Sequence, residues 1–413
     1  MTARLTAGRW QLKLRKGDVA RVEPIRVLFV NHTAKAGGGE LALRLLVRHL
    51  DRKLVQPQIV LFEDGPIAEM LREEAQVHIL PLAAEIQERR KDSLDTIRIR
   101  DLLQLSALPS FIVRLSRMME RLEVDVVHTN SLKADILGGI AARLARKRVV
   151  WHVRDRITED YLPSATVRAF RQLARLIPHA IIANSHSTLD TLRGPACASP
   201  RARRDSITVA HDGFDFAELP APEETSQSDL VVGLVGRISP WKGQDVFLRA
   251  IHRIHLEFPG ARFHIIGSAL FGEKAYADRL RTLCSELGLD ACVDFCGFVR
   301  DIQKHISTLD IVVHASTIPE PFGQVIIEGM AAGKPIIATR GGGAAEIVVD
   351  GVSGLLVSMN DSEALASALR SLIADASLRT RLGVGGRRRV EDAFRIEFTA
   401  AKVGRVYSEL CAR

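Results

Sequence analysis

At 413 residues the chain is too long for one ordinary hydrophobic core, and its length predicts two or three domains. Hydrophobic residues make up 46% and charged residues 26%, a globular composition that excludes a disordered, collagen-like or disulfide-scaffold protein. The net charge of +8 is uneven, because residues 1–200 hold 32 Lys and Arg against 22 Asp and Glu, whereas residues 201–413 hold 25 against 27. An acidic partner is therefore expected at the first half.

The chain opens with a loose basic leader over residues 1–23, in which charges interrupt every apolar run. No apolar stretch reaches the roughly 18–20 residues that a membrane span needs. Five cysteines without a secretory signal indicate a reducing compartment, so we expect a cytoplasmic protein. No zinc-finger spacing or RNA-binding signature is present, and we expect no nucleic-acid partner.

Short runs rich in Val and Ile alternate with helical stretches, which is typical of parallel sheets buried on both faces. We expect strands at 25–30, 57–62, 77–82, 124–128, 148–153, 180–184 and 206–210 in the first half. The second half predicts strands at 230–236, 262–267, 292–297, 311–315, 335–339 and 354–357. Residues 217–229 between the halves have the composition of a linker. The pattern predicts two Rossmann-like α/β domains, over 24–216 and 230–390.

Polar residues follow many of these strands. Ligands of open parallel sheets bind outside the carboxyl ends of the strands. We therefore expect the carboxyl edges of the two sheets to face each other across an interdomain cleft. One of these residues is His128, at the end of a Val-rich strand. A lone histidine is more often structural than catalytic, but this place keeps both interpretations open.

The first strand is followed by a glycine-rich turn, AGGGE at 36–40. Gly38 and Gly39 allow a phosphate or sugar to approach the backbone N–H groups. The turn also satisfies the loose dinucleotide fingerprint, but six residues separate the preceding strand from the glycines, where that fingerprint leaves almost none. An NAD-binding interpretation is therefore weak.

Residues 109–122 predict a helix with apolar residues such as Phe111 and Leu115 along one face and Arg114, Arg117 and Arg121 on another. Such a helix either covers its own sheet or rests on an anionic membrane surface. The positive charge of the first half fits the second alternative.

The loop 236–243, GRISPWKG, follows the first strand of the second domain. Its glycines, including Gly236, allow the loop backbone to lie close to a ligand. Arg237 and Lys242 in the same loop are two fixed cations that suit a diphosphate. Two ordinary surface charges are the alternative. Cys292 and Cys296 lie about 13 Å apart on an extended strand, so they cannot share a metal ion.

The strongest local signal is 319–334, PEPFGQVIIEGMAAGK. Glu320 lies in an extended loop, and the N–H groups of residues 323–325 form an anion site at a helix start. Glu328 follows about one turn into the helix. Two carboxylates beside an anion site suit hydrogen bonds to sugar hydroxyls, with a solvated pair of glutamates as the alternative.

In their order, AGGGE, His128, GRISPWKG and Glu320-x7-Glu328 resemble the family 4 glycosyltransferases over roughly residues 25–410. Smaller agreements are TVAHDGFD at 208–215, GFVRD at 297–301 and TRGGGAAE at 339–346. The resemblance implies the GT-B fold, with an acceptor-binding first domain and a second domain that binds a nucleotide sugar. It also implies that a C-terminal helix within 391–413 crosses back to the first domain.

The resemblance assigns roles to residues. It implies that Arg237 and Lys242 hold the diphosphate, Glu320 the donor sugar and Glu328 the ribose, while His128 lies beside the reacting sugar. The implied donor-binding residues are Gly38, Gly39, Gly236, Phe298, Val299, Phe322, Gly323, Gln324 and Glu328. The acceptor candidates are His32, Asn130, Arg154 and Asp155. For Arg154 and Asp155 a buried ion pair is the alternative.

The implied activity is retaining sugar transfer, of the hexosyltransferase type, from a UDP- or GDP-sugar to a glycan or lipid-linked acceptor in polysaccharide assembly. The departing phosphate oxygen would deprotonate the acceptor, so neither a protein nucleophile nor a metal cofactor is expected; the chain has no Asp-x-Asp site. A GT-B-fold epimerase or hydrolase and a non-catalytic nucleotide-sugar-binding subunit are the alternatives. Peripheral contact with the inner face of the cytoplasmic membrane is a further expectation.

Overall fold

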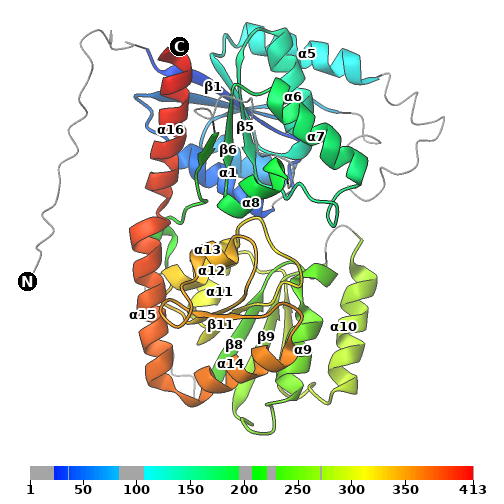
Figure 1. Ribbon diagram of the computed structural model, residues 1–413, viewed down its shortest axis with the longest axis vertical. Helices are drawn as coiled ribbons and strands as arrows, with labels where there is room; N and C mark the ends of the chain where they lie inside the picture. The colour runs from blue at the N-terminus through cyan, green and yellow to red at the C-terminus, as the bar shows by residue number, and fades with distance from the viewer. Residues whose placement is uncertain are drawn as a thin grey trace, which may run out of the picture.

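The structure, a computed structural model, describes residues 23–35, 37–82, 107–194, 207–220, 229–269 and 272–412. Two α/β domains lie one above the other in Figure 1, and each is built on a parallel sheet. This architecture confirms the predicted fold class. Residues 1–22, the basic residues 89–100 and most of the expected linker lie outside the described residues.

The first domain has a seven-stranded parallel sheet in the order β3-β2-β1-β4-β5-β6-β7. Its strands are β1 (Ile25–Asn31), β2 (Val55–Leu61), β3 (Gln76–Ile79), β4 (Val126–Thr129), β5 (Arg148–Val153), β6 (Ala180–Ala183) and β7 (Ile207–Val209). Its helices are α1 (Gly38–His49), α2 (Pro66–Arg72), α5 (Ala107–Arg121), α6 (Leu132–Leu144), α7 (Ser164–Leu176) and α8 (His186–Arg193). Helices cover both faces, which is why the central strands β1, β4, β5 and β6 are buried along nearly their whole length.

The second domain has a six-stranded parallel sheet in the order β10-β9-β8-β11-β12-β13. Its strands are β8 (Leu230–Val235), β9 (Ala261–Ile266), β10 (Val293–Gly297), β11 (Ile311–His314), β12 (Ile336–Thr339) and β13 (Leu355–Val357). Its helices are α9 (Gln244–His252), α10 (Lys274–Glu286), α11 (Ile302–Ser307), α12 (Gln324–Ala331), α13 (Ala344–Ile347), α14 (Ser362–Ala374) and α15 (Ala376–Ala393). Two core clusters fill the two faces of this sheet.

Helix α16 (Ile396–Ala412) leaves the second domain and packs against α1 and β1 of the first. Figure 1 shows α15 and α16 as one long column beside both domains. At the crossing, the backbone of Phe214 donates to Phe394 O at 2.8 Å and accepts from Ile396 N at 3.0 Å. A Cβ on Gly213 would lie 2.3 Å from the Ile396 Cα atom, so only glycine permits this close approach.

Helix α5 turns its apolar stripe inward. Phe111, Leu115 and Met119 are buried in the first-domain core, and α5 packs on α6. Arg114 and Arg117 remain exposed. Of the two interpretations of this helix, the packing supports the one in which its apolar face covers its own domain. Among the helices of the described ranges, none is long and apolar enough to cross a membrane.

Candidate active site

Glu320 is the centre of a buried polar cluster in the second domain. Its carboxylate accepts from Lys242 Nζ at 2.7 and 2.8 Å, and its Oε1 lies 2.9 Å from His314 Nε2. Ser316 Oγ also donates to this oxygen. Burial alone would raise the pKa of Glu320, but Lys242 and His314 hold it well below its ordinary value. Glu320 is therefore ionised, and it orders the end of β11 against the loop after β8.

That loop brings the two predicted cations to the carboxyl end of β8. The guanidinium of Arg237 and the ammonium of Lys242 lie 5.5 and 4.5 Å from the ring centroid of Trp241. Gly243 closes the loop with φ of +70°, and a Cβ there would lie 2.0 Å from the Ala315 oxygen. A side chain at this position would push the loop away from β11, so Gly243 fixes where Lys242 points.

Helix α12 begins beside Glu320. Gly323 is its N-cap with φ of +122°, Gln324 its first residue, and Phe322 lies buried just before. No side chain caps this helix end, so its first N–H groups remain available to an anion. Loss of solvation raises the pKa of Glu328 to about 7, although a hydrogen bond from Gln324 opposes this shift. Glu328 thus changes charge near neutral pH.

The segment TRGGGAAE at 339–346 packs against the loop that carries Glu320. Glu320 forms an isolated parallel bridge with Gly342, and Gly343 N donates to Glu320 O at 3.0 Å. A Cβ on Gly342 would lie 2.0 Å from the backbone oxygen of Glu320, and one on Gly343 would lie 2.3 Å from the backbone oxygen of Phe322. The two glycines therefore let one backbone lie directly on the other, which holds Glu320 in place.

In the first domain, Asn130 and Arg154 form a polar cluster under the glycine-rich turn. Arg154 Nε donates to Asn130 Oδ1 at 2.8 Å, and Asn130 Nδ2 donates to Gly39 O at 3.1 Å. Arg154 also forms a buried ion pair with Asp212. Arg154 therefore has a buried ion pair, the alternative given for it above, and its partner is Asp212. Gly38, the first residue of α1, is exposed with open space around it.

His128 does not lie where the resemblance implied. Its side chain is 0% exposed and contacts the Phe29 ring at 4.8 Å. Tyr407 of α16 hydrogen-bonds to its Nδ1 at 2.7 Å, and its Nε2 lies 3.2 Å from His152 Nδ1. Burial, with a smaller effect of Arg154, lowers its pKa to about 3. His128 is neutral and enclosed, so in this structure it cannot touch a sugar.

The other sequence candidates lie nearer the surface. His32 Nδ1 lies 2.7 Å from Ser131 Oγ, and Asp155 accepts from the Tyr161 hydroxyl at 3.0 Å. Phe298 is 70% exposed, which leaves its ring available to a base, while Val299 packs partly against the core beneath α11. A Cβ on Gly236 would lie 3.6 Å from Lys242 Cδ, in ordinary van der Waals contact.

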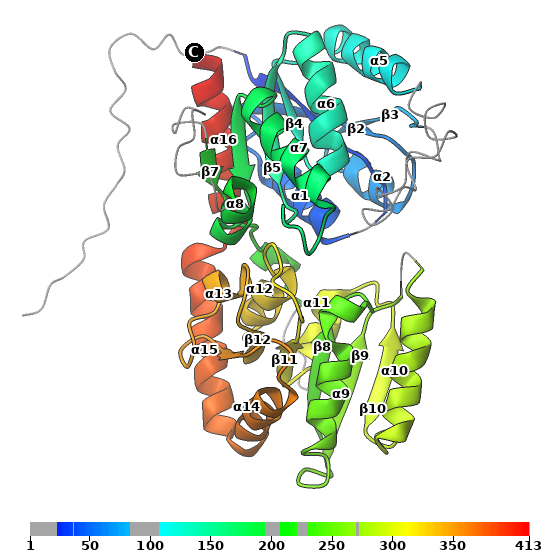
Figure 2. The same ribbon diagram turned by 45° about the vertical axis from the view of Figure 1, so that its right-hand side comes forward.

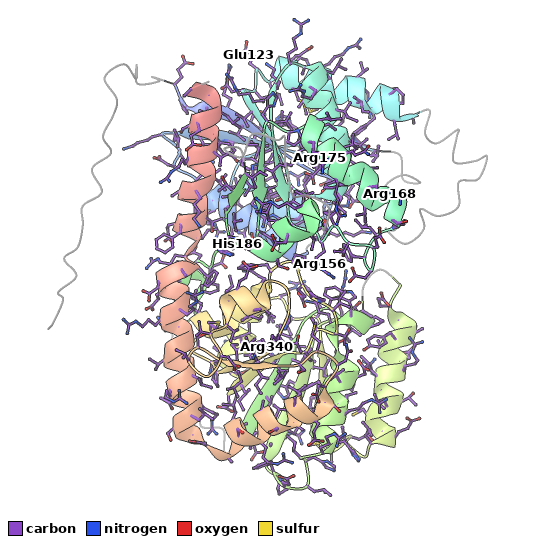
Figure 3. The ribbon with its side chains drawn as sticks, in the orientation of Figure 1. Glu123, Arg156, Arg168, Arg175, His186 and Arg340 are labelled. Carbon is purple, nitrogen blue, oxygen red and sulfur yellow. The ribbon has the colours of Figure 1, made fainter. Side chains whose placement is uncertain are left out.

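Glu346 of α13 joins the two domains, a role that the sequence did not indicate. Its carboxylate accepts from His186 N at 2.9 Å and from Ser187 N at 2.7 Å, the first N–H groups of α8. His211 Nε2 lies 2.9 Å from the same carboxylate. Figure 3 shows His186 and Arg156 at the edge of the first domain that faces the second. Burial would raise the pKa of Glu346, but His211 and these N–H groups hold it below its ordinary value.

A second contact lies beside the first. Ser185 Oγ and Thr188 Oγ1 donate to Pro321 O at 2.5 and 3.2 Å, so the residue after Glu320 contacts the start of α8. The carboxyl end of β6 thus meets the loops after β11 and β12, as Figure 2 shows around α8 and α13. The facing edges that the sequence predicted are therefore present.

Two groups of metal-ligating side chains occur within the described residues: His186, His211 and Glu346, and His264, Cys296 and His305. In the first, the hydrogen bonds just described occupy the Glu346 carboxylate. Neither group includes a residue that was assigned to the diphosphate or to the donor sugar.

Comparison with known families covers most of the chain. Residues 36–217 match the family model described as Glycosyltransferase Family 4, and residues 215–389 match the one described as Glycosyl transferases group 1. The chain belongs to the family 4 glycosyltransferases. The two models meet at residues 215–217, where the structure passes from the first domain to the second.

Two curated relatives of this chain carry names that refer to lipopolysaccharide core biosynthesis. The lipopolysaccharide core biosynthesis glycosyltransferase LpsE of Rhizobium meliloti is 34% identical over 42% of this chain and 46% of its own length. The lipopolysaccharide core biosynthesis mannosyltransferase LpcC of Rhizobium leguminosarum is 31% identical over 49% of this chain and 60% of its own. The chain thus matches about half the length of these relatives.

Solved structures cover nearly the whole chain. The structure of HepE from Anabaena in complex with UDP and glucose has 28% identity and a TM-score of 0.80, over 93% of this chain and 100% of that one. Sucrose-phosphate synthase from Thermosynechococcus elongatus, at 21% identity, has a TM-score of 0.72 over 94% of this chain and 99% of its own. Both agree with the GT-B fold.

Proposed function

We propose that this glycosyltransferase moves a sugar, with retention of its anomeric configuration, from a UDP- or GDP-sugar to a glycan or lipid-linked acceptor. The observation that carries the proposal is the Lys242–Glu320 pair beside Arg237 and the open N-terminus of α12. This set combines fixed cations for a diphosphate with a carboxylate for sugar hydroxyls. HepE, whose structures contain UDP and UDP-glucose, supports the choice of donor class.

Donor binding would rearrange the charges around Lys242. A diphosphate between Arg237 and Lys242 competes with Glu320 for the ammonium group, and this frees a carboxylate oxygen to accept from a sugar hydroxyl. His314 and Ser316 keep Glu320 in place during the exchange, because both contact its Oε1. Glu328 would accept from the ribose hydroxyls when ionised.

The proposed mechanism leaves the deprotonation of the acceptor to the donor itself. Glu320 stays hydrogen-bonded to His314 and Ser316 when the donor engages Lys242, which makes it a weak nucleophile. The departing phosphate oxygen would take the acceptor proton on the same face as the attack, so the configuration is retained. Arg237, Lys242 and the α12 N–H groups would stabilise the charge on the leaving diphosphate, and we propose that the transfer needs no metal cofactor.

The acceptor would meet the first domain. The proposed acceptor contacts are the backbone at Gly38–Gly39, His32 and Asp155, at the carboxyl edge of its sheet. The buried Asn130 and Arg154, which are hydrogen-bonded to each other, form the floor beneath them. The positive charge of the first half suits an anionic glycolipid at the cytoplasmic membrane surface. The names of LpsE and LpcC point the same way, toward glycoconjugate assembly.

Product analysis tests the proposal. The chain is incubated with UDP-glucose, UDP-N-acetylglucosamine or GDP-mannose and a panel of glycolipid and oligosaccharide acceptors, and the new linkage is assigned by NMR. An α-linked product from an α-linked donor is the expected result. Conversion of the donor without any acceptor would favour the epimerase or hydrolase alternative. Donor binding without turnover on any acceptor would favour a non-catalytic subunit.

Membrane contact has its own test. We expect the chain to float with liposomes that contain anionic phosphatidylglycerol, and to stay with the soluble fraction when the liposomes contain phosphatidylcholine alone. The difference should disappear in high salt, because screening weakens the attraction. Equal non-binding to both liposomes would contradict a peripheral membrane location.

A further inference from the structure

Three side chains that commonly ligate metals converge in the second domain, outside the residues assigned to the donor. His264 lies in β9, Cys296 in β10 and His305 in α11. One ligand atom from each lies within 4.8 Å of the others, and all three residues are half-buried. Cys296 still cannot share a metal ion with Cys292. In the structure, two histidines from other elements lie near Cys296 instead.

The sheet geometry explains how these residues meet. In the parallel pair of β9 and β10, His264 lies opposite Asp294, and side chains alternate between faces, so Cys296 is on the face of His264. The register shifts between Phe295 and Gly297, which makes Cys296 the extra residue of a bulge. Helix α11 covers this face, because its Ile306 packs in the same core cluster as Ile266 of β9.

Two nitrogen atoms of the cluster are buried without a hydrogen-bond partner among the described residues: Nδ1 of His264 and Nε2 of His305. Buried polar atoms without a partner are uncommon in folded proteins, and a metal ion would satisfy both of these. The other ring nitrogen of His264 lies 3.7 Å from Asp294 Oδ2. Histidines that bind metals usually have such a carboxylate behind them, which orients the ring.

We propose that His264, Cys296 and His305 bind a zinc ion. Thiolate and imidazole are both ligand types that zinc binds in proteins, and small shifts of half-buried side chains would bring their ligand atoms to bonding distance. The fourth tetrahedral position is left to water or another ligand. Asp294 acts through His264 as a positioning residue.

The site has a structural consequence. Cys296 precedes, and His305 follows, the segment 297–301, which carries Phe298 and Val299. A zinc ion would tie both flanks of this segment to β9. If the proposed function is correct, the metal fixes the loop that lines the nucleotide base, but the binding of zinc does not depend on that function.

Direct zinc binding by the full chain tests the proposal, with no nucleotide present. The purified chain is stripped with a chelator, dialysed and titrated with zinc chloride against a chromophoric competitor. We expect one equivalent of zinc to bind, and Cys296→Ser and His305→Asn each to weaken its affinity at least about 100-fold. Cys292→Ser is the matched control, because Cys292 is another half-buried free thiol next to the same strand. It should bind zinc as the unchanged chain does.

Cobalt substitution gives a second readout of the ligands. The Cys292→Ser chain with Co²⁺ should show the thiolate-to-metal charge-transfer absorption, and the Cys296→Ser chain should lack it. Circular dichroism confirms that each variant is folded. Absence of stoichiometric zinc binding, or equal affinity in all four chains, would overturn the proposal and would leave the donor site untouched.

Discussion

Lys242 and Glu320 form a pair that serves both stability and ligand binding. Their side chains are only 16% and 9% exposed, so the loss of either charge leaves the other one poorly solvated. His314 and Ser316 add contacts to Glu320 that survive when Lys242 is engaged elsewhere. The carboxylate can therefore change partner without leaving its position.

Replacing Lys242 should separate these two roles. We expect Lys242→Ala to lower kcat/KM for sugar transfer at least about 100-fold, because a fixed cation no longer stabilises the leaving diphosphate. It should also lower the free energy of unfolding by about 2–3 kcal/mol, since Glu320 loses its counter-charge. Lys274→Ala, an exposed change at the start of α10, is the control in both assays. Unaltered transfer by Lys242→Ala would refute the proposed diphosphate site.

Glu328 gives the donor site a dependence on pH. Its pKa of about 7 means that the carboxylate is mostly protonated at pH 6 and mostly ionised at pH 8. Ribose hydroxyls donate to the ionised form, so donor affinity should rise about tenfold over this interval. Glu328→Gln should remove most of the rise, as measured by titration calorimetry with UDP or GDP. An equally steep pH profile in this variant would assign the effect to another group.

For single residues, the sequence predicted the place in the fold better than the neighbouring side chains. Residue types and spacing placed Lys242 and Glu320 at the correct edge, and the structure brings them into contact. His128 was misplaced because β4 ends at Thr129 and not at 128, which puts His128 inside the strand. Its partner Tyr407 lies 279 residues away in sequence, and no local pattern reports such a contact.

Helix α16 packs on the first domain, although it lies at the far end of the sequence. Val403 and Tyr407 complete the core under β1 and β4, and the Tyr407 hydroxyl starts a buried polar chain through His128 and His152. Arg154 ends this chain, since its guanidinium lies 3.3 Å from His152 Nδ1. The helix therefore supports the floor of the proposed acceptor site.

Tyr407→Phe tests this support. It removes the hydroxyl and leaves His128 Nδ1 buried without a partner, so we expect the free energy of unfolding to fall by about 1–2 kcal/mol. Arg405→Ala, an exposed change on the same helix, should have little effect. Chemical denaturation monitored by tryptophan fluorescence measures both variants. A Tyr407→Phe chain as stable as the Arg405→Ala chain would show that the hydroxyl contributes nothing.

Strands and their order along the chain were predictable, because parallel sheets buried on both faces leave continuous apolar runs between helices. The run IVVHA at 311–315, for example, contains β11, which spans Ile311–His314 and is buried along its whole length. Contacts between elements were not predictable in this way. The bulge at Cys296 and the position of α11 over β9 depend on three-dimensional packing, and so the cluster of His264, Cys296 and His305 became visible only in the structure.

Polar contacts join the two domains, and Glu346 makes three of those within the described residues. Helix α8 presents two free N–H groups, and a carboxylate from the other domain satisfies both. This contact depends on an ionised Glu346, whose lowered pKa keeps it charged at neutral pH. The stabilisation is present above the ordinary pKa of a glutamate and is lost as the pH falls through the lowered value.

Glu346→Gln should loosen the arrangement of the domains. The amide keeps one acceptor oxygen but loses the charge that favours the α8 N-terminus, so we expect a larger radius of gyration in small-angle X-ray scattering at neutral pH. The unchanged chain should approach the same value only in acid. Glu363→Gln, which affects an exposed ion pair within the second domain, is the control. Identical scattering from both variants would contradict a role of Glu346 in joining the domains.

The binding of a nucleotide to the whole molecule tests the central claim most directly. A thermal-shift panel compares UDP, GDP, ADP and NAD with the common sugar conjugates of the nucleotides, for the unchanged chain and for Glu328→Ala. A ligand at 100 times its Kd adds about 2.7 kcal/mol, which for a chain of 413 residues is a rise in Tm of about 3 °C. We predict that the UDP or the GDP series gives this rise and that Glu328→Ala reduces it. A rise with NAD alone, or with no nucleotide at all, would contradict the assignment of a nucleotide-sugar site.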